Sequence, residues 1–288
     1  MDEVKIEIIR DDSKKFVIDN TDWHIPSSTG LQGFGELENE IFKNNNAVGD
    51  GTIIQAFRTG AKDRTIEFHN RFPRKTNNEL RDQVIDFFNP ERMYKIYVTY
   101  MGKVRWCEGI IYKMDVPTVN INWRINVSIT FLCPDQYMRS YDDFGKDIAT
   151  IYPMEAFPYL CGIDEGRTTG EFAFNQIVVI NNDGYTKTRP KVVLKALGTV
   201  KNPKIIINGY YVRVLTTMTE NDVIEMDFTQ RPPTIKMNGK NCMGSCDKKS
   251  CFNKMYLDVG DAEVAFDADE GTNVLSVSIY YNKLYWGI

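Results

Sequence analysis

The feature that most constrains the fold is an alternating run near the middle of the chain. From Ile121 to Cys133 every second residue is apolar, and the residues between them are polar as far as Thr130. This pattern predicts a β-strand with one buried and one hydrated face. Because strands average about 5–6 residues, a strand of this length is expected to bend around a barrel or to reach beyond its own domain. Pro134 ends the run.

Shorter segments of the same kind precede this run. We expect strands at residues 4–9, 16–18, 53–58, 64–70, 95–100 and 104–114. Residues 20–52 differ, because they are rich in glycine and asparagine and hold no period of 2 or 3.6. We therefore expect them to form a long loop that is functional or disordered.

One helix is predicted between Thr76 and Phe88. Thr76 and Glu79 have the spacing of a capping box. Leu80, Val84 and the phenylalanines at 87 and 88 then fall on one helical face, and Asn89-Pro90 ends the helix. A helix packed across a sheet is the expected arrangement.

The second half is expected to contain strands without helices. Residues 134–175 have few aliphatic side chains and are interpreted as a linker. Strands are predicted at residues 177–180, 191–197, 204–207, 210–214, 223–228, 234–237 and 274–281. Asn208-Gly209 and Asn238-Gly239 predict tight hairpins. The fold class is therefore mainly β: a β-rich domain with one α-helix at 1–138 and a β-sandwich at 139–288.

Composition excludes several classes of protein. Among the 288 residues the net charge is −4, so no specific nucleic-acid binding is expected. No apolar run approaches the roughly 20 residues of a membrane helix, so no membrane insertion is expected. The acidic start, Met1 to Val4, lacks the pattern of an export signal. We expect folding in a cytosol, with the six cysteines as thiols.

Few residues have the spacing of a chemical site. Cys242, Cys246 and Cys251 are the best candidates, because their C-x3-C-x4-C spacing partly matches a zinc site and Cys161 could be a fourth ligand. The alternative is a cysteine-bearing loop after a hairpin, and we expect no metal and no cofactor. His69 lies on the polar face of a predicted strand, without a catalytic pattern around it.

Two charged clusters are weaker candidates. Asp267, Asp269 and Gly271 partly match a calcium loop, but Glu270 breaks the register, which favours an acidic turn. The basic residues before the helix are interpreted as a solvated edge of the sheet; they are Arg71, Arg74 and Lys75. With no catalytic set in the sequence, the chain is expected to act through binding surfaces and not as an enzyme.

Several stretches resemble phage distal tail proteins of the siphophage type. In the first half they are 30–38, 50–52, 63–68, the capped helix and 128–135. In the second half they are 182–184, 189–193, 207–209, 224–227 and 237–241. The order and spacing of these motifs together carry the resemblance, which spans nearly the whole chain.

The resemblance implies both a fold and a role. Members of this family have an N-terminal belt domain that assembles into a ring, usually a hexamer, followed by a galectin-like β-sandwich. The ring joins the tail tube to the tail-tip hub or tail-associated lysin protein and leaves a lumen for DNA. The protein would then be part of the virion tail tip, assembled in the bacterial cytoplasm. The family has no catalytic residues to transfer, and the cysteine loop at 242–251 departs from its pattern.

Two alternatives remain open on sequence grounds. One is a carbohydrate-binding module at the tail tip that contacts the host surface, with an aromatic platform at Tyr210 and Tyr211 or at Trp286. Core or interface aromatics are the simpler interpretation of these residues. The other is a tail-associated hydrolase, which would need paired acids or an activated nucleophile that the sequence does not offer.

Overall fold

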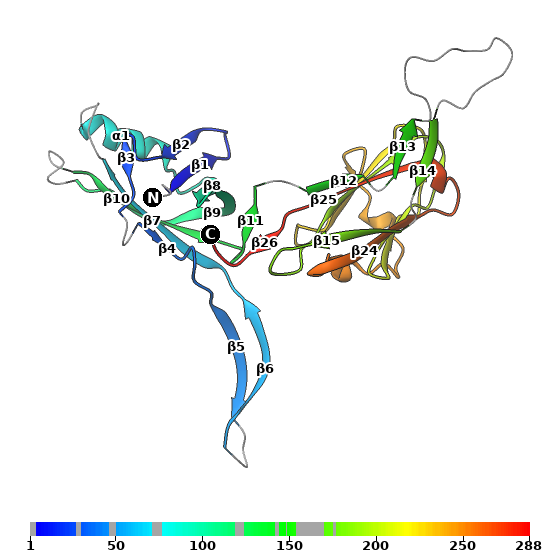
Figure 1. Ribbon diagram of the computed structural model, residues 1–288, viewed down its shortest axis with the longest axis horizontal. Helices are drawn as coiled ribbons and strands as arrows, with labels where there is room; N and C mark the ends of the chain where they lie inside the picture. The colour runs from blue at the N-terminus through cyan, green and yellow to red at the C-terminus, as the bar shows by residue number, and fades with distance from the viewer. Residues whose placement is uncertain are drawn as a thin grey trace, which may run out of the picture. The chain divides into compact units, whose positions relative to one another are not determined.

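The computed structural model describes residues 4–26, 30–45, 50–70, 77–118, 124–141, 144–147, 149–153, 170–174 and 177–288. The chain forms two compact units (Figure 1). The first comprises Met1–Tyr141 together with Leu284–Ile288, and the second comprises Asp142–Lys283. None of the described residues forms a helix that is long and apolar enough to cross a membrane.

Ten strands of the first unit form one antiparallel sheet. They are β1 (Lys5–Arg10), β2 (Lys15–Ile18), β3 (Trp23–His24), β4 (Leu31–Gln32), β7 (Lys62–Asn70), β8 (Met93–Tyr100), β9 (Lys103–Asp115), β10 (Asn126–Cys133), β11 (Met138–Ser140) and β26 (Leu284–Tyr285). Seven of them follow the order β2-β1-β8-β9-β10-β7-β3, while β4 pairs with β7, and β11 pairs with β9 and β26.

The core of the first unit lies between this sheet and the single described α-helix, α1 (Asn77–Phe87). Alternate residues of the strands point into it, as with Ile6 and Ile8 on β1, and the helix contributes Leu80 and Val84. Phe88, directly after α1, is also fully buried. The predicted helix and its buried face are confirmed, and the Thr76 cap lies outside the described residues.

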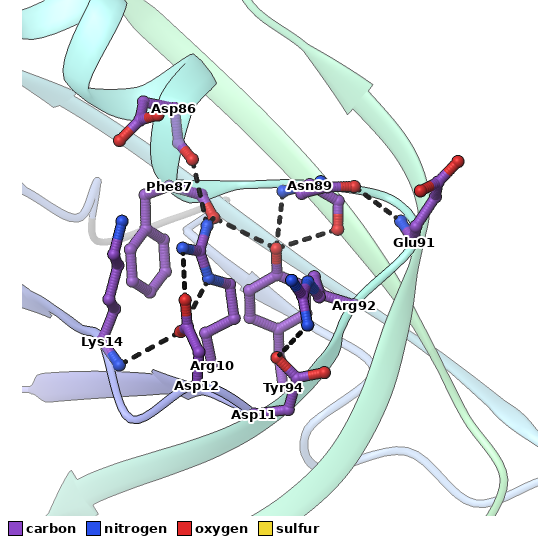
Figure 2. A network of polar contacts seen from close by, with 10 residues as sticks. All are labelled: Arg10, Asp11, Asp12, Lys14, Asp86, Phe87, Asn89, Glu91, Arg92 and Tyr94. Carbon is purple, nitrogen blue, oxygen red and sulfur yellow. Dashed lines mark hydrogen bonds and ion pairs between the residues drawn. The ribbon is translucent and has the colours of Figure 1, made fainter.

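A polar network fixes the C-terminal end of α1 to the sheet (Figure 2). The Arg10 guanidinium donates to the carbonyls of Asp86 and Phe87, at 3.0 and 2.8 Å. Tyr94 Oη lies 3.1 Å from the Phe87 carbonyl and accepts from the main-chain N–H of Asn89 at 2.6 Å. The last carbonyls of a helix have no partner within it, so these contacts satisfy groups that would otherwise be buried and unpaired.

The second unit contains two larger sheets. The six-stranded sheet has the order β12 (Phe144–Asp147), β25 (Leu275–Tyr281), β16 (Lys191–Ala196), β21 (Val223–Asp227), β22 (Thr234–Met237) and β23 (Lys240–Asn241). The four-stranded sheet has the order β15 (Ile177–Asn182), β24 (Gly260–Asp267), β18 (Lys204–Ile207) and β19 (Tyr210–Arg213). Two further pairs are β13 (Ala149–Pro153) with β14 (Gly170–Phe174), and β17 (Val200–Lys201) with β20 (Thr217–Met218). Three short 3-10 helices lie at Met243–Ser245, Phe252–Lys254 and Thr272–Val274.

The two larger sheets share one hydrophobic core. Val192 and Leu194 of the six-stranded sheet belong to the same buried cluster as Ile205 and Val264 of the four-stranded sheet. Side chains from two facing sheets that interdigitate in this way define a β-sandwich. The prediction of a mainly β chain is confirmed, and the described residues of the second half contain no α-helix.

Both predicted Asn-Gly hairpin turns are present. Asn208 and Gly209 have φ values of 49° and 79°, and Asn238 and Gly239 have 49° and 78°. A type I′ turn needs positive φ at both central residues, which asparagine and glycine tolerate best. These two turns therefore fix the register of β18 with β19 and of β22 with β23.

The predicted strand at the middle of the chain is shorter in the structure. β10 begins at Asn126; residues 124 and 125 precede it, and residues 119–123 lie outside the described part. The ladder ends there because the Asn70 side chain accepts the main-chain N–H of Ile125 at 2.9 Å. From Ile125 to Cys133 the apolar face is buried, as predicted.

Two segments without sequence periodicity contain strands, which corrects the prediction. Residues 20–52 include β3, β4 and a further strand, β5 (Asn39–Asn45). Residues 134–175 include β11, β12, β13 and β14. Several of these strands pair with distant partners, such as β11 with β26 and β12 with β25, so a local apolar pattern is not what defines them.

The sequence analysis also missed β24, which lies between β15 and β18. Its buried residues are Ala262, Val264 and Phe266, and acidic residues alternate with them, so the segment resembled an acidic loop.

The end of the chain returns to the first unit. Tyr285 and Leu284 pair with Met138 and Arg139. Residues 139–141 and 284–288, which the sequence analysis assigns to the second domain, therefore lie in the first unit.

Candidate assembly surface

A two-stranded arm is the most exposed apolar element of the first unit. β5 pairs with β6 (Thr52–Thr59), from Asn39↔Thr59 to Asn45↔Thr52. Among the described residues the two strands pair only with each other, and every residue of both is exposed. Figure 1 shows the pair extending away from the sheet of the first unit.

The arm carries large apolar side chains on both faces. Cross-strand partners Ile41 and Phe57 are 55% and 74% exposed, and Ile54 is 65% exposed. On the opposite face, Phe42 lies 5.6 Å from the Arg58 guanidinium. A two-stranded hairpin is marginal in water by itself, and an exposed apolar patch of this kind marks an interaction site. The arm therefore has the properties of an element that is completed by another chain.

A buried lysine anchors the base of the arm. Lys62 is 3% exposed, and its Nζ lies 3.0 Å from Glu38 and 3.7 Å from Glu36. The Gln136 side-chain amide donates to the Glu38 carbonyl at 2.6 Å. The chain entering β5 is thus tied to the start of β7, because a buried cation needs its carboxylate partners.

A buried arginine on the same face of β7 also anchors this region. Arg64 is 1% exposed and donates to the Gln136 carbonyl at 2.6 Å, and its guanidinium lies 5.7 Å from the Phe34 ring. Lys62 and Arg64 lie in phase with Ile66 and Phe68 on the buried face of β7. Charged side chains are rarely buried unless they are paired, so residue type gives no signal for this role.

A glycine permits the close approach of β4 to β7. Gly33 has φ +78°, and a Cβ there would lie 2.2 Å from the Asp63 carbonyl oxygen. Only glycine combines this dihedral with this contact. The glycine-rich segment of the sequence thus has a packing role beside the arm.

The structure does not bring the three candidate cysteines together as a metal site. Cys246 Sγ lies 4.0 Å from the carbonyl of Cys242, and the thiol of Cys251 is directed to the Lys249 carbonyl at 3.6 Å. Within the described ranges, no group of three metal-ligating side chains could hold an ion. Cys161 lies outside those ranges. Burial raises the pKa of Cys246 to about 11, which keeps this sulfur a neutral thiol.

A second cysteine pair escaped the sequence analysis. Cys107 and Cys133 are buried in the first unit, with their Sγ atoms 3.9 Å apart. The sulfur–sulfur hydrogen bond between the two thiols is the main reason that the pKa of Cys133 is lowered. The sequence shows that each cysteine lies in a predicted strand. Their contact depends on how β9 and β10 are paired, which the sequence alone does not show.

The acids of the partial calcium loop are engaged by basic side chains. Lys204 lies 2.9 Å from Asp267, Arg213 contacts Asp269, and Lys201 lies 3.1 Å from Glu270. The carboxylates thus serve as ion-pair partners at the end of β24. The basic cluster of Arg71, Arg74 and Lys75 lies outside the described residues.

The aromatic residues of the proposed sugar platform lie on different units. Tyr210, on β19, is 42% exposed and lies beneath Lys254, whose Nζ is 5.6 Å from the ring. Tyr211 is partly buried. Trp286 is 47% exposed and belongs to the first unit.

The only two histidines of the chain lie side by side. His24 on β3 is the direct partner of His69 on β7, with ring centroids 5.1 Å apart. The His24 ring is held by Asn20, with 2.6 Å between Nδ1 and Oδ1. Burial lowers the pKa of His69, and the charges of Arg124 and His24 lower it further.

Because the pKa of His69 is lowered, we expect the folded protein to lose stability in mild acid. Near the ordinary histidine pKa of about 6.5 the unfolded chain takes up a proton before the folded chain does. The contribution of His69 is therefore intact above that pH and is lost as the pH falls through its lower, folded-state pKa. The difference in unfolding free energy between wild type and His69→Gln should shift in favour of the variant from about pH 7.5 to 5. Urea titrations across this range test this, and parallel pH profiles would contradict it.

Known phage tail proteins are similar to this chain in sequence or in fold. Residues 183–285 match the family model described as siphovirus-type tail component, C-terminal domain. The crystal structure of the SPP1 Dit protein, described as a paradigm of the hub adsorption apparatus in phages infecting Gram-positive bacteria, matches with a TM-score of 0.65 at 11% identity. That match covers 97% of this chain and 98% of that one.

Two structures of the phage P2 baseplate in its activated conformation share the fold as well. The calcium form matches at a TM-score of 0.50 and the strontium form at 0.52, each at 11% identity. The calcium match covers 100% of both chains, and the strontium match covers 99% of both. No curated protein matches the chain in a sequence search.

Proposed function

We propose that this chain is a structural tail component of the siphovirus Dit type, as the family match over residues 183–285 and the shared fold support, and that it forms a ring joining the tail tube to the tail-tip hub. The ring is a homo-oligomer, a hexamer by analogy with the family, and its lumen lets DNA pass. The first unit, residues 1–141 with 284–288, builds the ring, and the second unit, residues 142–283, forms a galectin-like sandwich. The chain has no catalytic role.

The exposed β5–β6 arm is the observation that carries this proposal. Its apolar side chains are exposed among the described residues, so a neighbouring copy is the natural partner. Ring contacts are heterologous: one patch of each protomer meets a different patch of the next. An arm anchored at its base by the contacts of Lys62 and Arg64 suits such a contact, because these contacts restrict its orientation.

Charge supports the remainder of the proposal. A net charge of −4 gives no general attraction for DNA, as a passage for DNA requires. The partners are the tube protein and the hub or tail-associated lysin protein, and the site of action is the virion tail tip after assembly in the host cytoplasm.

Native mass spectrometry of the full chain tests the proposal. We expect a discrete homo-oligomer, six times the 33.2 kDa protomer for a hexamer, and ring-shaped particles with outward lobes in negative-stain images. A strict monomer at high concentration that also fails to bind tube and hub proteins would overturn it.

A further inference from the structure

The two histidines of the chain are opposed on neighbouring strands at the edge of the sheet in the first unit. His24 of β3 is the direct partner of His69 of β7, with ring centroids 5.1 Å apart. Directly opposite residues of an antiparallel pair lie on the same face of the sheet. That face is the outer one, because His69 is partly exposed whereas its neighbours in β7, Phe68 and Asn70, are buried. His24 is partly exposed as well, so an ion in solution can reach both rings.

Asn20 holds the His24 ring in one orientation and one tautomer. Nδ1 of His24 lies 2.6 Å from the side-chain oxygen of Asn20. A carbonyl oxygen only accepts, so Nδ1 carries the proton, and in the neutral ring Nε2 keeps its lone pair. Asn20 is itself fixed in a turn, with φ +67° and its main-chain N–H donating to the Trp23 carbonyl at 2.9 Å. A histidine that ligates a metal commonly donates its other ring N–H to an oxygen in this way.

The His69 ring is the adjustable member of the pair. The two rings meet edge to face, with an interplanar angle of 72°. Rotation of a histidine ring about χ2 is broad and inexpensive, so His69 can turn one nitrogen toward Nε2 of His24. An ion bound about 2.0–2.1 Å from each nitrogen needs the two nitrogens to be about 3 Å apart. The cross-strand spacing of the rings allows this separation.

Two imidazole nitrogens determine the class of ion that fits. Imidazole suits Zn²⁺, Cu²⁺ and Ni²⁺, whereas Ca²⁺ and Mg²⁺ prefer oxygen ligands. The charge of Arg124 acts on His69 and opposes a cation there, while Glu67, on the same face of β7, has the opposite charge. A structural zinc site has four protein ligands, and this pair supplies two, with water in the remaining positions. The ion is therefore expected to bind reversibly.

We propose that His24 and His69 together bind a divalent transition-metal ion of the Zn²⁺, Cu²⁺ and Ni²⁺ class, with Asn20 orienting His24. The ion joins β3, a two-residue strand at the edge of the sheet, to the longer β7. The site needs only these two strands of the first unit, so it does not depend on ring formation.

Calorimetric titration of the untagged full chain with Ni²⁺ tests the site. We expect saturable binding of one ion per protomer, and no binding of Ca²⁺ at the same concentrations. His24→Gln and His69→Gln should each abolish the saturable binding, because either change leaves a single imidazole. Asn20→Gly keeps the positive φ that glycine tolerates but removes the acceptor for Nδ1. This variant should bind about tenfold more weakly, the usual effect of losing the partner of a ligating histidine.

The matched control replaces the other side chains that could take such an ion. Cys242, Cys246 and Cys251 are partly exposed thiols in the second unit, and their triple serine variant should bind Ni²⁺ as wild type does. Thermal unfolding without metal establishes that each variant is folded. The proposal is overturned if wild type shows no saturable Ni²⁺ binding, if either histidine variant binds as tightly as wild type, or if the cysteine variant loses the binding.

Discussion

Replacing Ile41, Ile54 and Phe57 with serine is expected to abolish assembly and to leave the folded protomer intact. These side chains are 55%, 65% and 74% exposed, so their loss removes no contact from the core of the first unit. If they are buried against a neighbouring copy, each contributes about 1.5–3 kcal/mol to the contact. The triple variant should then associate about a thousandfold more weakly or worse. Sedimentation velocity at matched concentrations measures the shift from oligomer to monomer.

A matched control removes similar side chains elsewhere. Leu197, Leu215 and Val259 are 39%, 49% and 55% exposed in the second unit. Their triple serine variant should assemble as wild type does. An arm variant that still forms the wild-type oligomer would show that the arm is not the ring contact, whatever the oligomeric state of the protein.

Replacing Phe88 with alanine is expected to cause the largest loss of stability in the first unit. Phe88 is 1% exposed and packs in an aromatic cluster, with ring centroids 4.8 Å from Phe87, 5.1 Å from Phe16 and 6.0 Å from Tyr94. A buried phenylalanine replaced by alanine typically costs about 3–5 kcal/mol, from lost burial together with the cavity that remains. Urea denaturation followed by tyrosine and tryptophan fluorescence measures this cost.

The control for this substitution lies on the other face of α1. Ile85 is 40% exposed, so Ile85→Ala should cost about 1 kcal/mol or less. The two units have separate hydrophobic cores, and the unfolding of the second unit should be unchanged by Phe88→Ala. Equal effects of the two substitutions would contradict the role assigned to the aromatic cluster.

Local patterns in the sequence were sufficient to predict the strands and the helix that bury one face. Alternation identified β1, β7 and β9 within a few residues, and the apolar spacing after Glu79 identified α1 and its buried side. The Asn-Gly pairs at 208–209 and 238–239 placed two hairpins. In each case the information lies within a few neighbouring residues, because burial of one face imposes a period of two or 3.6.

The candidate assembly surface was only partly predictable. The strand at 53–58 was expected, but its partner β5 was not, because asparagine, lysine and glutamate interrupt its apolar residues. The anchors at its base were also missed. Lys62 and Arg64 are buried only because carboxylates and carbonyls of distant segments, such as Glu38 and Gln136, reach them.

The sequence by itself determined that the chain is mainly β, which strand faces are buried and where two tight turns lie. Only the tertiary structure decided which strands are neighbours: that β24 lies between β15 and β18, that Tyr285 pairs with Met138, and that the arm pairs with nothing but itself among the described residues. Periodicity is a property of a few consecutive residues. Strand pairing joins main-chain groups that all residues share, across separations of more than a hundred positions, so it follows from the packing of whole sheets.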